Sequence, residues 1–273
     1  MSVAQSSPIR TMNPTTAHRA GDQLLQVSGL SKHFAGLKAV SEVSFSVEKG
    51  EIVGLIGPNG AGKTTLFNCV AGAFAPTAGS IKFDGQEIAG LESSRIARRG
   101  LARTYQNLRV FSDMTVFDNV STGAIGRIGT SLWSALAPGL SKHKEEQIAE
   151  ATLEALRTFD LIEFADQPAG NLSYGQKKNL EMARAMSLKP KLLMLDEPAA
   201  GLNDTETAQL AERVMALRDS GLTIMLVEHD MPMVMRVCER IVVLETGKLI
   251  ANGDPASIRN DKAVRAAYLG EDQ

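Results

Sequence analysis

The chain has 273 residues, of which 44% are apolar, enough to bury a core as one large domain or as one domain carrying an inserted subdomain. Its 29 Lys and Arg residues nearly balance its 31 Asp and Glu residues, which gives a formal net charge of −2. This balance excludes the basic excess of a general nucleic-acid or anionic-membrane binding protein, so any phosphate site must be local.

The first 22 residues lack the apolar stretch of a signal peptide, and no run in the sequence approaches the ~20 apolar residues that cross a bilayer. We expect residues 1–22 to be a disordered tail, and the protein to stay in the cytosol unless a partner holds it at a membrane. Cys69 and Cys238 are too few and too far apart for a disulfide framework or a metal site. We expect both to be small core residues in a reducing compartment.

The folded part is expected to begin with β-structure. Apolar patterning predicts strands at residues 24–30 and 43–47, and the more continuous apolar run at 51–56 predicts a buried strand. A Gly-rich turn follows, and helical spacing resumes over residues 63–70. A further short strand is predicted at residues 80–83 before the turn at Asp84-Gly85.

Residues 115–184 read differently, because apart from expected loops at 126–129 and 138–139 they show mostly helical spacing. We interpret about 107–186 as a helical subdomain inserted in the core. Apolar strands and amphipathic helices then alternate: strands at 192–195, 222–227 and 241–244, and helices at 204–218 and 231–238. Such alternation predicts a parallel α/β core, so residues 23–273 are expected to form a single α/β domain with the helical insert.

A P-loop pattern stands between the predicted buried strand and the helix after it, as Gly57-Pro58-Asn59-Gly60-Ala61-Gly62-Lys63-Thr64. The glycines let successive backbone N–H groups turn toward phosphates at a helix N-terminus, where the helix dipole also favours an anion. Lys63 is expected to reach the β- and γ-phosphates of ATP, and the Thr64 hydroxyl to hold Mg²⁺. We count Thr65 with this nucleotide-binding loop.

Two adjacent acids, Asp196 and Glu197, end the predicted apolar strand at 192–195. A buried strand does not end in paired carboxylates without a reason. Asp196 suits the water shell of Mg²⁺, and Glu197 suits polarising the attacking water, a general-base role worth ~10²–10⁴ in rate. With the P-loop, these acids predict ATP hydrolysis.

Three further stretches resemble the ATP-binding subunits of ABC transporters. Leu172-Ser173-Tyr174-Gly175-Gln176 is similar to the ABC signature motif, Gln106 resembles the glutamine of the Q-loop, and His229 resembles the switch histidine. The resemblance covers nearly all of the chain from residue 24 and implies the ABC-ATPase form of the P-loop NTPase fold, with an antiparallel β subdomain beside the parallel core.

The same resemblance implies a head-to-tail dimer with two ATP molecules between the subunits. Ser173, Gly175 and Gln176 of one subunit would lie at the nucleotide held by the other subunit. Phe34 matches the family's adenine-stacking aromatic, although a core Phe is almost as plausible on the sequence. His229 would contact the γ-phosphate, and Gln106 would touch Mg²⁺ while its loop follows contacts with the membrane partner.

Two positions depart from the commonest family pattern: Tyr174 replaces Gly in the signature, and Asn203 replaces Asp in the loop after the catalytic acid. Together with Arg103-Thr104-Tyr105-Gln106 and the ending Ala267-Tyr268-Leu269-Gly270-Glu271, they resemble the longer of the two ATPases in bacterial branched-chain amino acid uptake. That resemblance implies two membrane permease subunits, a paralogous second ATPase, a periplasmic solute-binding protein, and a peripheral place on the cytoplasmic face of the inner membrane.

Other functions stay open at this point. An ATPase of an envelope lipid or lipopolysaccharide exporter has a similar ending but usually keeps Gly at the position of Tyr174. Soluble ABC proteins of DNA repair or translation usually carry a coiled-coil insert, an iron–sulfur segment or two cassettes, which this sequence lacks. A nucleotide-binding regulator without hydrolysis should lack Glu197 or His229, and both are present.

Overall fold

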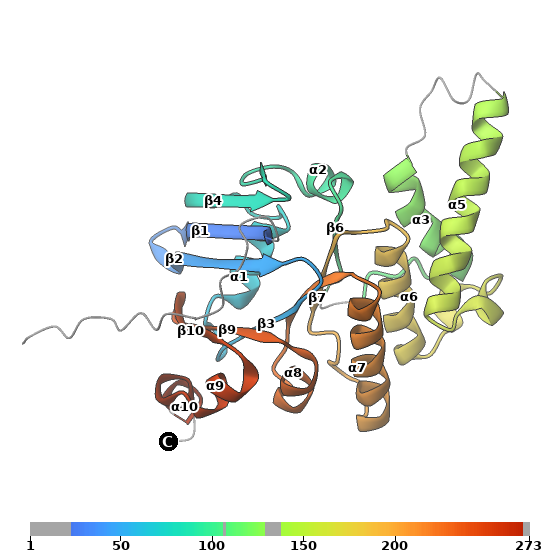
Figure 1. Cartoon of the computed structure of the whole chain (residues 1–273). Helices are drawn as coiled ribbons and strands as arrows, with labels where there is room; N and C mark the ends of the chain where they lie inside the picture. Colours follow the sequence, from blue (N-terminus) through green and yellow to red (C-terminus); the bar gives the residue numbers. More distant parts are fainter. Residues whose placement is uncertain (1–22, 106–107, 129–137, 270–273) are drawn as a thin grey trace, which may run out of the picture.

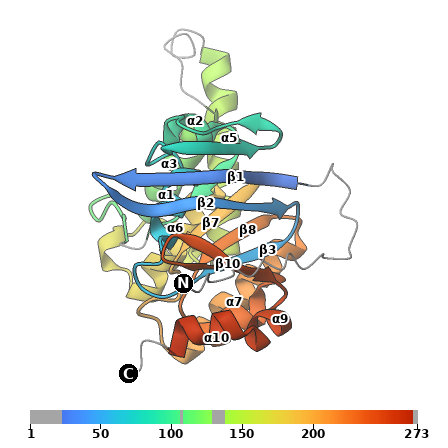
Figure 2. The same cartoon turned by 90° about the vertical axis from the view of Figure 1, so that its left-hand side faces the viewer.

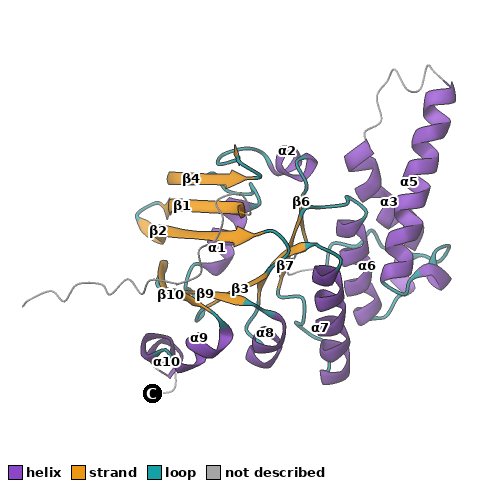
Figure 3. Cartoon of the chain, viewed as in Figure 1, coloured by secondary structure: helices purple, strands orange, loops and turns teal. Residues whose placement is uncertain are grey.

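A computed structural model describes residues 23–105, 108–128 and 138–269. Two sheets lie one above the other, with a lobe of helices beyond them (Figures 1 and 3). The smaller sheet has the strand order β2-β1-β4-β5 and pairs antiparallel throughout. Its strands are β1 (Gln23–Phe34), β2 (Leu37–Glu48), β4 (Ala78–Phe83) and β5 (Gln86–Glu87).

The larger sheet has the order β10-β9-β3-β8-β7-β6, and its neighbours are parallel except where β10 meets β9. Its strands are β3 (Ile52–Ile56), β6 (Leu101–Arg103), β7 (Leu192–Asp196), β8 (Thr223–Val227), β9 (Arg240–Glu245) and β10 (Lys248–Gly253). Every residue of β3, β7 and β8 is buried, as expected of parallel strands covered on both faces. The predicted α/β class is therefore confirmed.

Two apolar cores lie on the two faces of the larger sheet. One joins the sheet to the antiparallel strands and to α1 (Lys63–Val70), with Phe67 and Phe83 among its fully buried side chains. The other joins it to α6 (Tyr174–Met186), α7 (Asp204–Asp219) and α8 (Met231–Val237). Cys69 lies in the first core and Cys238 in the second, so the prediction that both are core residues is confirmed.

The helices α3 (Val116–Ile128), α5 (Pro138–Thr158) and α6 make up the lobe beyond the sheets (Figure 1). α3 packs against both α5 and α6. Gly123 permits this close approach, because a Cβ there would lie 2.3 Å from the carbonyl oxygen of Arg184 on α6. The lobe occupies the stretch that the sequence assigns to a helical subdomain.

Several local expectations were wrong. α3 runs to Ile128 and α5 begins at Pro138, where loops were expected at 126–129 and 138–139; proline is compatible with the first turn of a helix. α2 (Ser93–Arg98), β6, β10, α9 (Pro255–Asn260) and α10 (Lys262–Leu269) were not predicted. The last two lie below the sheets in Figures 1 and 2. The tail expected at residues 1–22 lies outside the described residues.

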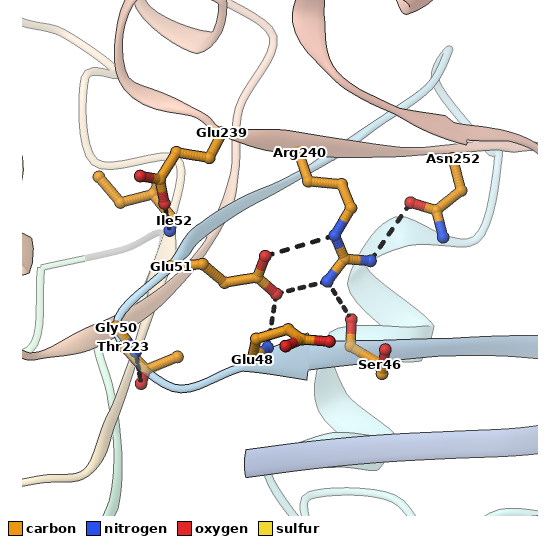
Figure 4. Close-up of polar contacts among 9 residues, drawn as sticks. All are labelled: Ser46, Glu48, Gly50, Glu51, Ile52, Thr223, Glu239, Arg240 and Asn252. Carbon is orange, nitrogen blue, oxygen red and sulfur yellow. Dashed lines mark hydrogen bonds and ion pairs between the residues drawn. The ribbon is translucent and has the colours of Figure 1, made fainter. Parts of the chain in front are cut away.

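A set of polar contacts joins the two sheets where β2 turns into β3 (Figure 4). Arg240, at the start of β9, donates to the carbonyl oxygen of Ser46 on β2 at 2.6 Å and pairs with the carboxylate of Glu51. The Gly50 N–H donates to Thr223 Oγ1 on β8 at 2.9 Å. The Arg240 and Glu51 side chains are both largely buried, so removing one would leave the other charge buried without its partner. Since Arg240 lies on β9 and also bonds to β2, these contacts hold the two sheets in place relative to each other.

Among the residues that the structure describes, no helix is both long and apolar enough to cross a membrane.

Candidate nucleotide-binding and hydrolysis site

The loop 57–62 leaves the buried strand β3 and enters α1, and two of its glycines are required by close contacts. Gly57 has φ +150°, and a Cβ there would lie 2.1 Å from the carbonyl oxygen of Leu244. Gly62, the N-cap of α1, has φ +94°, and a Cβ there would lie 2.3 Å from the carbonyl oxygen of Ala39. Only glycine fits these positions, so the loop is a tight backbone turn at a helix N-terminus.

Lys63 begins α1 and folds back over the loop. Its amine donates to the carbonyl oxygens of Gly57 at 2.6 Å and Pro58 at 3.0 Å. Thr64 and Thr65 follow in the first turn, where Thr64 is exposed and Thr65 partly exposed. Of the loop, Asn59 and Gly60 are exposed and Ala61 is buried. The predicted P-loop residues therefore form one accessible cradle of backbone and ammonium groups that is suited to phosphate.

Phe34, the candidate for adenine stacking, ends β1 with a 39% exposed side chain, so it is not a core residue. Its ring meets the ring of Phe74 edge-on, with centroids 5.4 Å apart, and the Lys32 amine lies 4.9 Å from the Phe34 centroid. Nothing in the sequence pattern pointed to Phe74. An exposed aromatic ring can stack on a planar base.

The acids at the end of β7 lie in different surroundings. Asp196 is buried, and its carboxylate pairs with the Arg103 guanidinium at 3.1 Å. Burial raises the pKa of Asp196, and Arg103 opposes that shift. Glu197 has φ +46°, an unusual value for a residue with a side chain, and its N–H donates to the carbonyl oxygen of Val227 at 2.9 Å.

His229 follows the neighbouring strand β8, and parallel pairing brings it beside Glu197. The His229 Nδ1 atom lies 4.0 Å from Glu197 Oε1, and the two side chains are 67% and 21% exposed. The buried carboxylate of Glu228 orders both loops, since it accepts from the N–H groups of Ala199 at 2.7 Å and His229 at 3.1 Å. The structure thus brings Glu197 and His229 together.

Arg103 and Glu228 are functional candidates that the sequence reasoning missed. Besides Asp196, Arg103 contacts Asn68 Oδ1 on α1 and lies over the rings of Phe67 and Tyr105 at 5.1 and 4.9 Å. It therefore ties the strand-end acid to the helix that follows the phosphate cradle. One signal in the sequence could have pointed to Arg103: a buried carboxylate at the end of a core strand, such as Asp196, requires a partner of opposite charge.

Thr64 and Asp196 are the described residues that were expected to hold Mg²⁺. Hydroxyl and carboxylate are hard oxygen donors, and Mg²⁺ in nucleotide sites is held by one or two such side chains together with substrate phosphates and water. Within the described ranges, no cluster of three or more His, Cys, Asp or Glu forms an all-protein metal cage. The residues therefore fit Mg²⁺ bound together with a nucleotide. Gln106, the third predicted ligand, lies outside the described residues.

The signature residues stand at the start of α6. Ser173 is the N-cap: its hydroxyl accepts from the Gln176 N–H at 3.3 Å, and the Gln176 side chain accepts from the Ser173 N–H at 2.8 Å. A Cβ on Gly175 would lie 2.8 Å from Glu206 Oε1, the flexible end of a side chain on α7, so the start of α6 lies close against α7. In Figure 1, α6 and α1 lie on either side of β6 and β7, and the two helices pack into different cores on opposite faces of the larger sheet.

Asn203, one of the two departures, has a local explanation. It is the N-cap of α7, where its side chain accepts from the Glu206 N–H at 3.0 Å and the Glu206 carboxylate accepts from the Asn203 N–H at 3.0 Å. Asn and Asp serve about equally well as N-caps, so this exchange preserves the start of the helix.

The comparisons with known proteins agree with this geometry. The family model described as ABC transporter matches residues 40–200, and the model described as Branched-chain amino acid ATP-binding cassette transporter matches residues 248–273. The chain is 45% identical over 251 residues to the high-affinity branched-chain amino acid transport ATP-binding protein BraF of Pseudomonas aeruginosa, which covers 91% of this chain and 98% of BraF.

A second relative serves a different system. The lipopolysaccharide export system ATP-binding protein LptB of Escherichia coli is 36% identical over 248 residues, covering 91% of this chain and 98% of LptB. Among solved structures, the ADP conformation of MJ1267, an ATP-binding cassette of an ABC transporter, matches with a TM-score of 0.79 and 30% identity, covering 91% of this chain and 99% of that chain.

Proposed function

Because this chain belongs to the ATP-binding, ATP-hydrolysing subunits of ABC transporters, we propose that it powers uptake of branched-chain or related amino acids through a membrane permease. The observation that carries this choice is the match of residues 248–273 to the branched-chain amino acid family model. The 45% identity to BraF against 36% to LptB favours the same reading over envelope export. We take residues 23–273 as one ABC domain with its helical subdomain at about 107–186.

The proposed nucleotide roles use the residues of the site described above together with Gln106. The backbone of residues 57–62 and the Lys63 amine bind the phosphates of ATP, and the ring of Phe34 stacks on the adenine. Thr64, Asp196 and Gln106 would hold Mg²⁺, which when bound neutralises charge on the phosphates. Thr65, in the first turn of α1, is included in the same nucleotide-binding loop.

Hydrolysis is assigned to Glu197 and His229. Glu197 accepts a proton from the water that attacks the γ-phosphate, and His229, 4.0 Å from Glu197, contacts that phosphate. Both groups sit at the carboxyl ends of parallel strands, the edge of an α/β sheet where ligands bind. The strained backbone of Glu197 is typical of a residue that is held for function.

The proposed site includes a second subunit, because α6, which begins just after Ser173, and α1 pack on opposite faces of the larger sheet. In a head-to-tail dimer Ser173, Gly175 and Gln176 would contact the nucleotide of the partner, with the positive end of α6 toward its γ-phosphate. We propose that the partner is a paralogous ATPase and that the dimer closes when ATP binds.

The permease is expected to dock beside the Q-loop. A groove there is lined by Tyr105, Arg109, Phe111, Glu181 and Arg184. The Arg109 guanidinium lies 4.5 Å from the Tyr105 centroid, and Arg184 lies 5.5 Å from that of Phe111. Such a mixed aromatic and cationic groove suits a short helix from a membrane partner. Two permease subunits would hold the protein at the cytoplasmic face of the inner membrane, supplied by a periplasmic solute-binding protein.

The test is to purify the complex from membranes and reconstitute it in vesicles with the associated solute-binding protein. We expect leucine, isoleucine, valine or a related amino acid to stimulate ATP turnover and to accumulate inside, and the same complex carrying Glu197→Gln to do neither. Turnover that responds to lipopolysaccharide but to none of these amino acids would overturn the import proposal.

A further inference from the structure

Two side chains near the start of α6 donate hydrogen bonds to the backbone of the loop that begins at Glu197. The Tyr174 hydroxyl donates to the carbonyl oxygen of Ala200 at 3.1 Å. One turn later on the same face of α6, the Lys178 amine donates to the carbonyl oxygen of Glu197 at 3.2 Å. The same amine lies 5.8 Å from the centre of the Tyr174 ring. Two side chains of the signature helix therefore hold both ends of the backbone segment 197–200.

The loop is shaped to receive the tyrosine ring. Gly201 has φ +79°, and a Cβ there would lie 2.9 Å from a ring carbon of Tyr174 and 3.1 Å from its hydroxyl oxygen. A glycine at 201 is therefore needed both for the backbone conformation and for contact with the ring. Tyr174, which departs from the commonest signature pattern, and the glycine that follows Ala200 fit each other in space.

Lys178 is placed to act on Glu197 itself. Its side chain is buried, and burial lowers its pKa, while the carboxylates of Glu181 and Glu228 oppose that shift. A buried amine needs an acceptor, and the Glu197 carbonyl provides one. Glu197 holds a positive φ of 46°, and its N–H is bonded to Val227. The two peptide groups that flank this strained residue are thus held by β8 on one side and by α6 on the other.

We infer that Tyr174 and Lys178 are positioning residues that make the loop after Glu197 move with α6, so that the nucleotide at one site of the dimer sets the catalytic acid of the other site. The inference rests on the proposed function, because it requires Ser173 and Gly175 at the start of α6 to contact the partner's nucleotide. When that end of α6 moves, the hydrogen bonds of Tyr174 and Lys178 move the backbone at Glu197 of the same chain with it.

Tyr174→Phe tests this contact with the smallest change, since it keeps the ring and removes the hydroxyl. In the assembled complex we expect kcat to fall roughly 2- to 10-fold, the range equivalent to one hydrogen bond, and the Hill coefficient for ATP to fall toward 1. The Kd of the isolated chain for ATP should stay unchanged. Tyr268→Phe on α10 is the matched control and should leave all three values unchanged.

Hydrogen exchange separates positioning from general stability. In the wild-type complex a non-hydrolysable ATP analogue should slow exchange in both residues 57–65 and residues 197–203. In Tyr174→Phe the analogue should still protect 57–65 but no longer protect 197–203. Protection of both segments together with an unchanged Hill coefficient would overturn the inference. Absence of protection at 57–65 in the wild type would instead contradict the proposed nucleotide site.

Gly201→Ala gives a second route that does not depend on the hydroxyl. In the wild-type background Gly201→Ala should lower kcat by a larger factor than in a Tyr174→Gly background. The cost of the positive φ is the same in both backgrounds, but the clash with the ring exists only where Tyr174 is present. Equal fold-losses in the two backgrounds would show that the ring and the loop are not coupled, and would also overturn the inference.

Discussion

The loop after β3 and the start of α6 each present glycines at a helix N-terminus, yet they reach their places by different means. The first sits at the edge of the parallel sheet, where strand pairing brings Glu197 and His229 to the same edge. The second is fixed by its capping box and by contacts with the loop 197–203 and α7. The first region takes its proposed phosphate-binding residues from a single chain, whereas in the proposed dimer the second would act on the nucleotide of a partner.

Glu197→Gln tests the single-chain region with the largest expected effect. Glutamine keeps the size of the side chain but cannot accept a proton, so ATP turnover should fall by ~10²–10⁴-fold. The affinity for ATP should be retained because the phosphate cradle is intact. Steady-state phosphate release and equilibrium ATP binding measure the two effects, with the exposed Glu212→Gln as control. Turnover equal to wild type would remove Glu197 from its role.

Lys63→Ala should abolish most binding rather than catalysis alone. Removing one member of a buried charge pair costs about 2–5 kcal/mol, or roughly 30-fold or more in Kd. Calorimetric titration with ATP measures this loss, and the exposed Lys248→Ala serves as the control. Wild-type affinity in Lys63→Ala would mean that the loop 57–62 is not the phosphate site.

The smallest effect is expected in the region around α6 and α7. Asn203→Ala removes the N-cap of α7, which should lower the free energy of unfolding by about 0.5–2 kcal/mol. The melting temperature should fall by about 2–4 °C for each kcal/mol. Gln209→Ala, exposed on the same helix, should leave it unchanged, and ATP affinity should be unaffected by either change. An Asn203→Ala protein as stable as wild type would show that the cap contributes nothing.

The same contrast explains how much could be predicted from the sequence. The P-loop and the Asp196-Glu197 pair are runs of adjacent residues whose chemistry follows from their order, and the structure places them at one sheet edge. Ser173 and His229 were recognised only by resemblance. Arg103, Glu228 and the contact of Tyr174 with the loop at Gly201 were missed, because each joins segments far apart in the chain and leaves no periodic or local signal.

The helices and strands also fall into those that could be predicted from the sequence and those that could not. The buried strands β3, β7 and β8 were expected from continuous apolar runs. By contrast β6 has three residues and α2 and α9 have six each, too short for a pattern to accumulate. Their places come from tertiary contacts, such as the parallel pairing of β6 with β7.

The central claim is that one catalytic site is shared between two subunits, and ATP-driven association tests it most directly. Glu197→Gln protein with its partner ATPase should form a stable dimer when ATP and Mg²⁺ are added, seen as a doubling of mass in sedimentation. Adding Ser173→Arg to that chain should prevent the dimer while leaving ATP binding to the separate chain measurable. A dimer that forms equally well with Ser173→Arg would contradict the shared site.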